Sequence, residues 1–303
     1  MAMKRTEKNR VEKLPDTDYT KKRSQLKMIM FRYSKNKLAV LGLIILIILS
    51  LCAIFADVIA DYDTMAIEQH IMEKLQPPSK EHWFGTDHYG RDVFARIVHG
   101  ARISLSMGIG TVFVSLAVGS LFGALAGYYG GKVDNIIMRV MDVFLAIPNI
   151  LMAVTIVGAL GGGLVNLLIA LSISSVPKFT RIIRSSILTV RDMDYIEAAK
   201  ACGTKDRRII LKHVIPNAIG PIIVNATLSL ANVILSISGM SFIGLGIEKP
   251  MPEWGSMLAE AKAQMRYYPS LVIIPGICIA LAVFGLNLVG DGLRDALDPK
   301  LKN

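Results

Sequence analysis

Residues 82–105 read HWFGTDHYGRDVFARIVHGARISL and hold three histidines, three arginines and two aspartates. Histidine and carboxylate side chains bind metals and transfer protons, so this segment is the first candidate for chemistry. The candidate ligands are His70, His82, His88 and His99, but no two have the i, i+4 helical spacing and no cysteine is near. We therefore expect no metal site and no catalytic residue here, and interpret the segment as a structural elbow.

The elbow is expected to end in a helix. Gly85-Thr86-Asp87 and Gly90-Arg91-Asp92 have the composition of turns. After them the apolar and polar residues separate onto two helical faces. The apolar face comprises Val93, Phe94, Ile97 and Val98, and the polar face comprises Arg96, His99 and Arg102. The pattern predicts an amphipathic helix that leads into the next apolar segment.

The elements around this segment are those of a membrane protein. Apolar residues make up 52% of the 303 residues, and a helix needs about 20 of them in succession to cross a bilayer. Six segments qualify or nearly do: 38–56, 103–131, 143–160, 164–176, 218–247 and 268–290. None of the six contains Asp, Glu, Lys or Arg, and 164–176 is expected to extend into its flanks. The sequence predicts an all-α integral membrane protein with six transmembrane helices.

Charge predicts the orientation of these helices. Residues 1–37 contain 12 Lys or Arg and four acids, which places this tail in the cytoplasm. Residues 57–102 have eight acids and five bases, whereas 177–217 have nine bases and four acids. Both termini are therefore expected in the cytoplasm. Because the net charge of +10 is concentrated in one tail, membrane lipid is the expected partner and nucleic acid is not.

Glycines in the second span predict close helix packing. Gly119, Gly123 and Gly127 recur every four residues, so one helical face is nearly bare backbone. Gly-Gly-Lys at 130–132 does not form a phosphate-binding loop, since the pattern needs Gly and Ser or Thr where this chain has Ala126 and Val133. We expect no cofactor in this chain.

The segment 191–217, between the fourth and fifth spans, is expected to have a mechanical role. Asp194 is a predicted N-cap and Gly203 a C-terminal stop, which gives a helix over 195–202. A second helical stretch is expected over 205–214, to stop near Pro216. From composition alone, the alternative to a mechanical role is an amphipathic helix that rests on lipid headgroups.

A resemblance favours the mechanical interpretation. The pattern of Glu197, Ala198, Ala199, Gly203 and Pro216 resembles the EAA motif of bacterial ABC importer permeases. In that family the loop forms a coupling helix that docks on a cytoplasmic ATPase subunit. His213 stands where the family usually has an aliphatic residue, and the variant HVxPNA is similar to the branch that imports peptides and nickel.

Two further segments narrow the resemblance. GTDxxGRD at 85–92, followed by GARISL at 100–105, is similar to the C-type permease of dipeptide and oligopeptide importers, as is FIGLGIEKPMPEWG at 242–255. By itself, Trp254 would indicate only a membrane-interface residue.

The resemblance implies a type I ABC importer permease fold in the cytoplasmic (inner) membrane. It implies a heterodimer with a B-type permease subunit, two cytoplasmic ABC ATPase subunits that bind ATP and Mg, and an extracytoplasmic solute-binding protein. Hydrolysis then belongs to the partners, and this chain is not an enzyme. Short peptides are the favoured substrate, and nickel is the alternative.

Polar residues in the last two spans are the candidates for the translocation path: Asn225, Ser229, Asn232 and Asn287. The alternative is that they form hydrogen bonds with a neighbouring helix. A different class, an ion-coupled secondary transporter, normally places an ionisable residue inside the membrane, and the six predicted spans contain none of the four charged types.

The predicted organisation has four parts. Residues 1–37 form a basic cytoplasmic tail, and residues 38–100 form the first span with its extracytoplasmic loop and elbow. Residues 101–291 form the permease domain with the coupling loop 191–217, and residues 292–303 form a cytoplasmic C-terminal tail.

Overall fold

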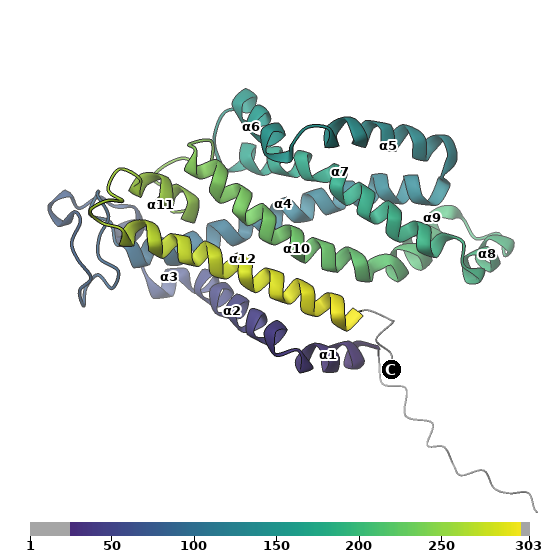
Figure 1. Cartoon of the computed structure of the whole chain (residues 1–303), viewed down its shortest axis with the longest axis horizontal. Coiled ribbons are helices and arrows are strands. Elements are labelled where there is room, and N and C mark those ends of the chain that lie inside the picture. The colour runs from purple at the N-terminus through teal and green to yellow at the C-terminus, as the bar shows by residue number, and fades with distance from the viewer. Residues whose placement is uncertain (1–24, 298–303) are drawn as a thin grey trace, which may run out of the picture.

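The computed structural model describes residues 25–297, and the tails before and after them lie outside the described residues. Within this range the chain is helical and contains no strand, only an isolated bridge between Thr86 and Asp92. The helices form an elongated bundle (Figure 1). In chain order they are α1 (Gln25–Lys35), α2 (Lys37–Ile54), α3 (Ala56–Ile59), η1 (Tyr62–Ile67), η2 (Ile71–Glu73), α4 (Val93–Tyr129), α5 (Gly131–Leu145), α6 (Asn149–Leu160), α7 (Leu164–Arg191), α8 (Asp194–Ala201), α9 (Asp206–Ile209), η3 (Ile210–Val214), α10 (Ile215–Phe242), α11 (Trp254–Ala261) and α12 (Ser270–Leu297).

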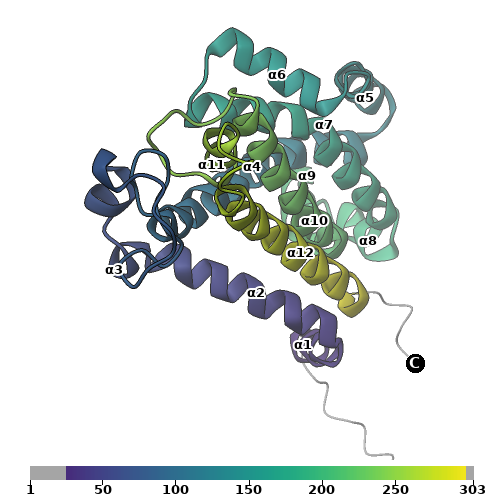
Figure 2. The same cartoon turned by 60° about the vertical axis from the view of Figure 1, so that its left-hand side comes forward.

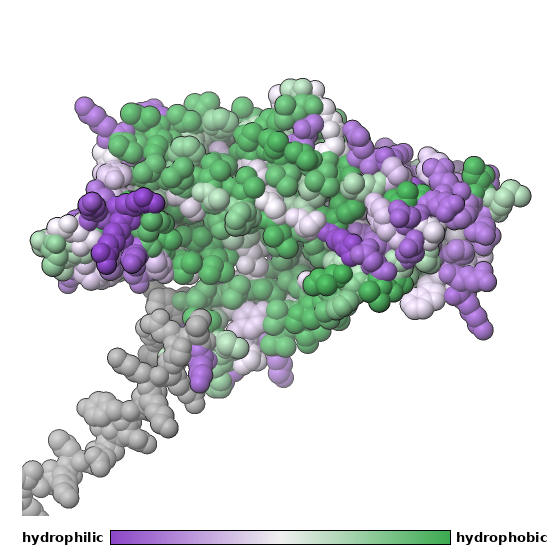
Figure 3. All heavy atoms as spheres, turned by 180° about the vertical axis from the view of Figure 1, so that it is seen from behind, coloured by the Kyte–Doolittle hydropathy of each residue, from purple (hydrophilic) through white to green (hydrophobic). Residues whose placement is uncertain are grey.

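Five helical segments are long and apolar enough to cross a membrane, and a sixth crossing results if the bent pair α5 and α6 is counted as one. The five are α2, α4, α7, the run from α9 to α10, and α12. Large aliphatic side chains are exposed along them, and they form an apolar belt between two polar ends (Figure 3). Such a belt suits the hydrocarbon of a bilayer, so the predicted membrane fold is confirmed.

The third predicted span, 143–160, is not one helix. The chain bends by 83° between α5 and α6, because Pro148 lacks an amide hydrogen and disfavours helical geometry at Ile147. Helix α5 is amphipathic, and Arg184 of α7 makes a bidentate ion pair with its Asp134, with 2.6 Å between Nη2 and Oδ2. The 12-residue α6 is too short to span a bilayer alone.

The predicted loop between the fourth and fifth spans is mostly helix. Helix α7 continues to Arg191, so the fourth span extends well beyond residue 176. Similarly, α4 begins at Val93, before the predicted boundary at residues 100 and 101, and α12 continues past residue 291 to Leu297. Apolar runs thus underestimate the helices that carry charge at their ends.

The glycine pattern of the second span packs α4 against α7, its most extensive neighbour. A Cβ atom on Gly119 would lie 2.7 Å from the Phe179 Cβ, and one on Gly123 would lie 2.7 Å from the Thr180 carbonyl oxygen. The predicted close approach is confirmed.

The bundle has two ends and two main apolar clusters. Helices α1 and α8 and the last turn of α12 lie at one end, here called the α8 end, and α3 and α11 lie at the other, the α11 end (Figure 1). One cluster joins α4, α6, α7, α8 and α10, and the other joins α2, α4, α11 and α12. Figure 2 shows α2 and α12 side by side, away from α5 and α6.

Candidate functional site

The histidine-rich elbow lies at the α11 end and leads into α4. Asp92 caps α4, since its Oδ1 accepts a hydrogen bond from the Ala95 amide at 2.7 Å, while its Oδ2 lies 2.7 Å from the His82 Nδ1. His99 Nε2 lies 2.8 Å from the Ala60 carbonyl oxygen. The predicted helix after residue 92 is confirmed, and these two histidines tie the elbow to α4.

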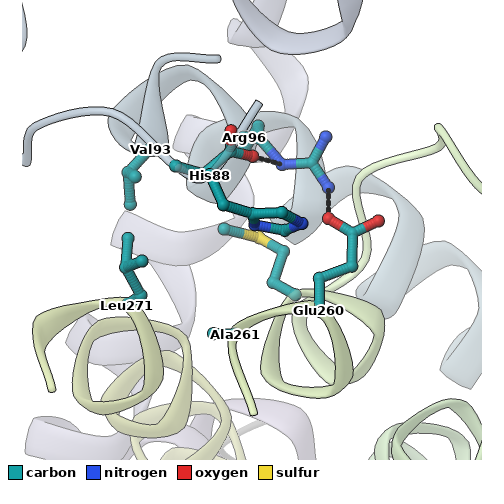
Figure 4. Close-up of a pocket in the computed structure, with 8 residues that line it drawn as sticks. His88, Val93, Arg96, Glu260, Ala261 and Leu271 are labelled. Carbon is teal, nitrogen blue, oxygen red and sulfur yellow. Dashed lines mark hydrogen bonds and ion pairs between the residues drawn. The ribbon is translucent and has the colours of Figure 1, made fainter. Parts of the chain in front are cut away.

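Two residues of the predicted polar face, Arg96 and His99, are buried, contrary to the amphipathic prediction, whereas Arg102 is partly exposed. Arg91 and Arg96 are each 1% exposed, and both donate to the Glu260 Oε2, with Arg96 Nη2 at 3.2 Å. Arg91 Nε also donates to the Asp87 Oδ2 at 2.7 Å. Figure 4 shows Arg96 and Glu260 facing each other. We call Asp87, Arg91, Arg96 and Glu260 the buried ion cluster; it joins α4 to α11.

Trp254 does not lie at a membrane interface, the position that its residue type alone would indicate. Its side chain is fully buried, and its Nε1 donates a hydrogen bond to the Ile97 carbonyl oxygen at 3.1 Å. The ring fits because a Cβ atom on Gly100 would lie only 2.9 Å from its Cδ1. Trp254 therefore belongs to the core at the α11 end.

The cavity beside the buried ion cluster is small. It measures about 20 Å³ and is lined in part by His88, Arg96 and Glu260, which leaves room for about one water molecule. Burial lowers the pKa of His88 below its usual value and outweighs the nearby Asp87 and Glu260 carboxylates, which raise it. The neutral His88 and the paired charges stabilise this end and offer no space for a substrate.

At the opposite end, α8 is the predicted coupling helix. It spans Asp194–Ala201, one residue earlier than predicted, and its N-cap is Met193, which makes no side-chain cap. Gly203 ends it with a φ of +72°. The Gly203 amide donates to the Lys200 carbonyl and the Thr204 amide donates to the Ala199 carbonyl, which together form a Schellman motif. The predicted glycine stop is confirmed, whereas the Asp194 cap is wrong.

The residues of α8 lie on two faces, one packed against the bundle and one exposed. Ile196 is fully buried in the cluster shared with α4, α7 and α10, and the half-buried Ala199 packs on the same cluster. Glu197 and Ala198 are exposed. The helix is thus anchored by one face and presents the other outward.

Polar contacts also link α8 and α9 to the bundle. Tyr128, near the end of α4, donates from its hydroxyl to the Asp206 Oδ1 of α9 at 2.8 Å. Lys200 of α8 lies 5.4 Å above the Tyr128 ring, a cation–π contact. Arg191 at the end of α7 donates to the Gly127 carbonyl at 3.1 Å. These contacts tie α8 and α9 to α4, and α4 to the end of α7.

The second helical stretch was predicted to stop near Pro216, but the structure shows that it continues. Helix α9 passes through the π-helical turn η3 into α10 without a break. Pro216 occupies the first turn of α10, where its missing amide hydrogen is accommodated by the wider π-helical turn before it. The motif therefore leads directly into a membrane-spanning helix.

The four candidates for the translocation path are distributed over separate surfaces. Ser229 and Asn232 line a cavity of about 50 Å³, Asn225 lines a second one of about 370 Å³, and Asn287 of α12 is exposed. Asn225 and Asn232 donate to carbonyl groups of their own helix, Pro221 and Leu228. They are thus not hydrogen-bonded to a neighbouring helix within residues 25–297, and their role in translocation stays a prediction.

This arrangement of helices matches known transport proteins. A family model described as the inner membrane component of binding-protein-dependent transport systems matches residues 119–303. The chain belongs to this family. A second model, the N-terminal transmembrane domain of oligopeptide transport permease C, matches residues 24–78 of the permease.

Curated relatives cover almost all of the permease. It is 48% identical to a dipeptide transport system permease protein of Alkalihalophilus pseudofirmus, over 89% of this chain and 88% of the relative. It is 40% identical to an oligopeptide transport system permease protein of Bacillus subtilis, over 90% and 89%. It is 43% identical to a di/tripeptide transport system permease protein of Pseudomonas aeruginosa, over 92% and 94%. The resemblance to C-type permeases is confirmed.

A solved structure supports the same fold. A chain of the inward-facing MetNI methionine ABC transporter superposes with a TM-score of 0.56 at 19% identity, and the match covers 67% of this permease and 96% of that chain. The predicted ABC importer permease fold is confirmed.

The sequence prediction missed Lys178. The fourth span was predicted as 164–176 with an extension into its flanks, but the residues from 177 onward were counted with the internal loop, whereas the structure places Lys178 inside α7. The spans therefore do contain an ionisable residue. The signal was the strong apolar pattern that resumes after it, at Phe179, Ile182 and Ile183.

Proposed function

We propose that this permease is the C-type transmembrane subunit of an ATP-driven importer of short peptides. The observation that carries the proposal is α8, whose exposed Glu197 and Ala198 project from a helix anchored by Ile196 in the core of the bundle. The printed names of the relatives, which refer to dipeptide, oligopeptide and di/tripeptide transport, support peptides as the substrate class.

The proposed assembly contains a B-type permease partner, two cytoplasmic ABC ATPase subunits that bind ATP and Mg, and an extracytoplasmic solute-binding protein. The basic charge of the N-terminal tail and of the α7 to α9 region supports a cytoplasmic location for the α8 end and both termini. ATP hydrolysis belongs to the ATPase subunits, and this chain supplies half of the membrane path.

In the proposed mechanism, α8 acts as a rigid lever. ATP binding brings the two ATPases together, and the groove that holds α8 moves with them. The Schellman end at Gly203 and the buried Ile196 keep α8 fixed to α4, α7 and α10. The movement would then switch the spans between outward-facing and inward-facing arrangements.

The test is uptake in cells that lack this chain. Labelled di-, tri- and longer peptides and radioactive nickel are compared after complementation with wild type, Glu197→Lys and the charge-preserving Glu197→Asp. We expect wild type and Glu197→Asp to restore peptide uptake, and Glu197→Lys to restore none at an equal amount of chain in the membrane. Restoration of nickel uptake alone would overturn the substrate, and full uptake with Glu197→Lys would overturn the lever.

A further inference from the structure

Lys178 is a cation in the middle of a membrane-spanning helix. It lies 14 residues beyond Leu164 in the 28-residue α7, which is about 21 Å along the helix axis. Its ammonium group forms no ion pair or hydrogen bond within residues 25–297. An unpaired charge at this depth is costly, so it must face water or an anion in the working protein.

The surroundings of Lys178 are polar. It lines the cavity of about 50 Å³ between α6, α7 and α10; Figure 2 shows α7 between α6 and α10. The other polar residues of the lining are Asn149, Ser175, Ser229, Asn232 and Ser236. No acid is among them, so Lys178 supplies the only full charge of the lining in the described part of the chain.

One of these polar groups has unused hydrogen-bonding capacity. The Ser229 Oγ is buried and has no partner within the described residues. Buried hydroxyl groups without a partner are uncommon in folded proteins. A ligand or water in the cavity would provide one.

We propose that Lys178 binds a carboxylate of the peptide as it passes through the membrane, with Ser229 as a neutral neighbour in the same cavity. This inference rests on the proposed function and names a specificity residue for it. The ammonium group of Lys178 would pair with a carboxylate through a charge-assisted hydrogen bond, and a peptide with an acidic side chain carries one carboxylate more than its basic counterpart. An acid of the second permease subunit is the competing partner for Lys178, and the experiment separates the two.

The experiment measures competitive uptake of two labelled tripeptides, with glutamate or lysine as the central residue, by the complete transporter in proteoliposomes. The variants are Lys178→Glu, Lys178→Gln and Lys178→Arg. The control is Lys132→Glu, a charge reversal at an exposed position of α5 that does not line the cavity. ATP hydrolysis stimulated by the binding protein is measured in parallel.

We expect Lys178→Glu to lower the uptake ratio of the acidic to the basic tripeptide at least tenfold, with Lys178→Gln intermediate. Lys178→Arg and Lys132→Glu should leave the ratio as in wild type, and stimulated ATP hydrolysis should persist in all variants. An unchanged ratio in Lys178→Glu would overturn the inference, as would an equal loss of both peptides with dissociation of the subunits, the signature of a structural ion pair. If wild type imports neither peptide, the proposed function fails, and this inference fails with it.

Discussion

Glu260 accepts hydrogen bonds from two arginines of the elbow, Arg91 and Arg96, at a site from which water is almost excluded. Asp87 supplies the second negative charge, so the buried ion cluster is neutral as a whole. Buried charges are tolerated only when they are paired and hydrogen-bonded, and removal of one member leaves the others uncompensated. This is why a segment with the composition of an active site has a structural role.

Glu260→Gln is expected to destabilise the α11 end. Loss of one partner from a buried ion pair costs about 3–5 kcal/mol, and here two guanidinium groups lose their shared acceptor. Thermal unfolding of the purified permease in detergent should show a clear decrease in Tm. The matched control is Glu248→Gln, which removes the charge of an exposed carboxylate and should leave Tm unchanged. Equal Tm values for the two variants would contradict the role of the cluster.

At the residue scale, the sequence predicts types of residue better than their partners. The histidines lack the spacing of metal ligands, which argued correctly for an elbow. Arg96 was predicted to face solvent, and this was wrong because its acceptor, Glu260, lies 164 residues away in the chain and could not be foreseen. Likewise, the residue type of Trp254 does not reveal its buried position, since its hydrogen-bond acceptor is 157 residues away. Pairings between distant segments depend on how the helices pack together, and the apolar pattern of one helix does not predict this.

At the scale of elements, the contact between α4 and α7 depends on missing side chains. Gly119, Gly123 and Gly127 let the backbones approach, and each position would place a Cβ atom within 3.0 Å of an atom of α7.

Gly123→Ala is therefore expected to push α4 away from α7. The added methyl would lie 2.7 Å from the Thr180 carbonyl oxygen and 2.9 Å from the Ile183 Cβ, an overpacking that costs about 1–3 kcal/mol. Gly276→Ala in α12, where nothing lies within 4 Å of the new atom, is the control and should be tolerated. Thermal unfolding of both variants measures the difference. A stable Gly123→Ala variant would show that the helices adjust freely.

The end of α8 gives a prediction about coupling. Gly203 has a φ of +72°, a conformation that costs about 1–2 kcal/mol for a residue with a Cβ atom and more for a branched one. Gly203→Val should therefore reduce peptide uptake per membrane-inserted chain, whereas Gly203→Asn, which tolerates this conformation, should retain most of it. Transport by Gly203→Val at the wild-type rate would mean that the Schellman end is not needed for the lever.

The elements themselves were largely predictable, with two physical exceptions. The lengths of the apolar segments predicted the positions of the other spans. The glycine stop predicted the position of α8 to within one residue. The third span was predicted to be continuous although Pro148 interrupts it. The fourth was predicted as 164–176 with an extension into its flanks, and its helix reaches Arg191 because charged residues such as Arg184 find partners on α5, here Asp134.

At the scale of the whole molecule, the apolar belt and the polar ends suit a bilayer, and the distribution of basic residues supports the proposed cytoplasmic location of the α8 end. The partner subunits and the substrate depend on surfaces that meet other chains, so no single element of this chain specifies them.

The orientation is testable with the native cysteines. Cys202 is exposed at the α8 end, whereas Cys52 and Cys278 are half-buried in α2 and α12. A membrane-impermeant maleimide should label Cys202 in spheroplasts only after permeabilisation. Trp83→Cys, at an exposed position of the α11 end, should be labelled in intact spheroplasts when Cys202 is replaced by Ser. The reverse pattern would invert the topology.

The central claim, that α8 couples this permease to an ATPase, is tested most directly by purification. The tagged permease is isolated in mild detergent from cells that express the whole system, and ATP hydrolysis is measured in the purified material, for wild type and for Glu197→Lys. We predict that ATPase activity copurifies with wild type and is lost with Glu197→Lys, while the variant remains folded and in the membrane. Purified wild type without ATPase activity, or Glu197→Lys with undiminished activity, would contradict the account.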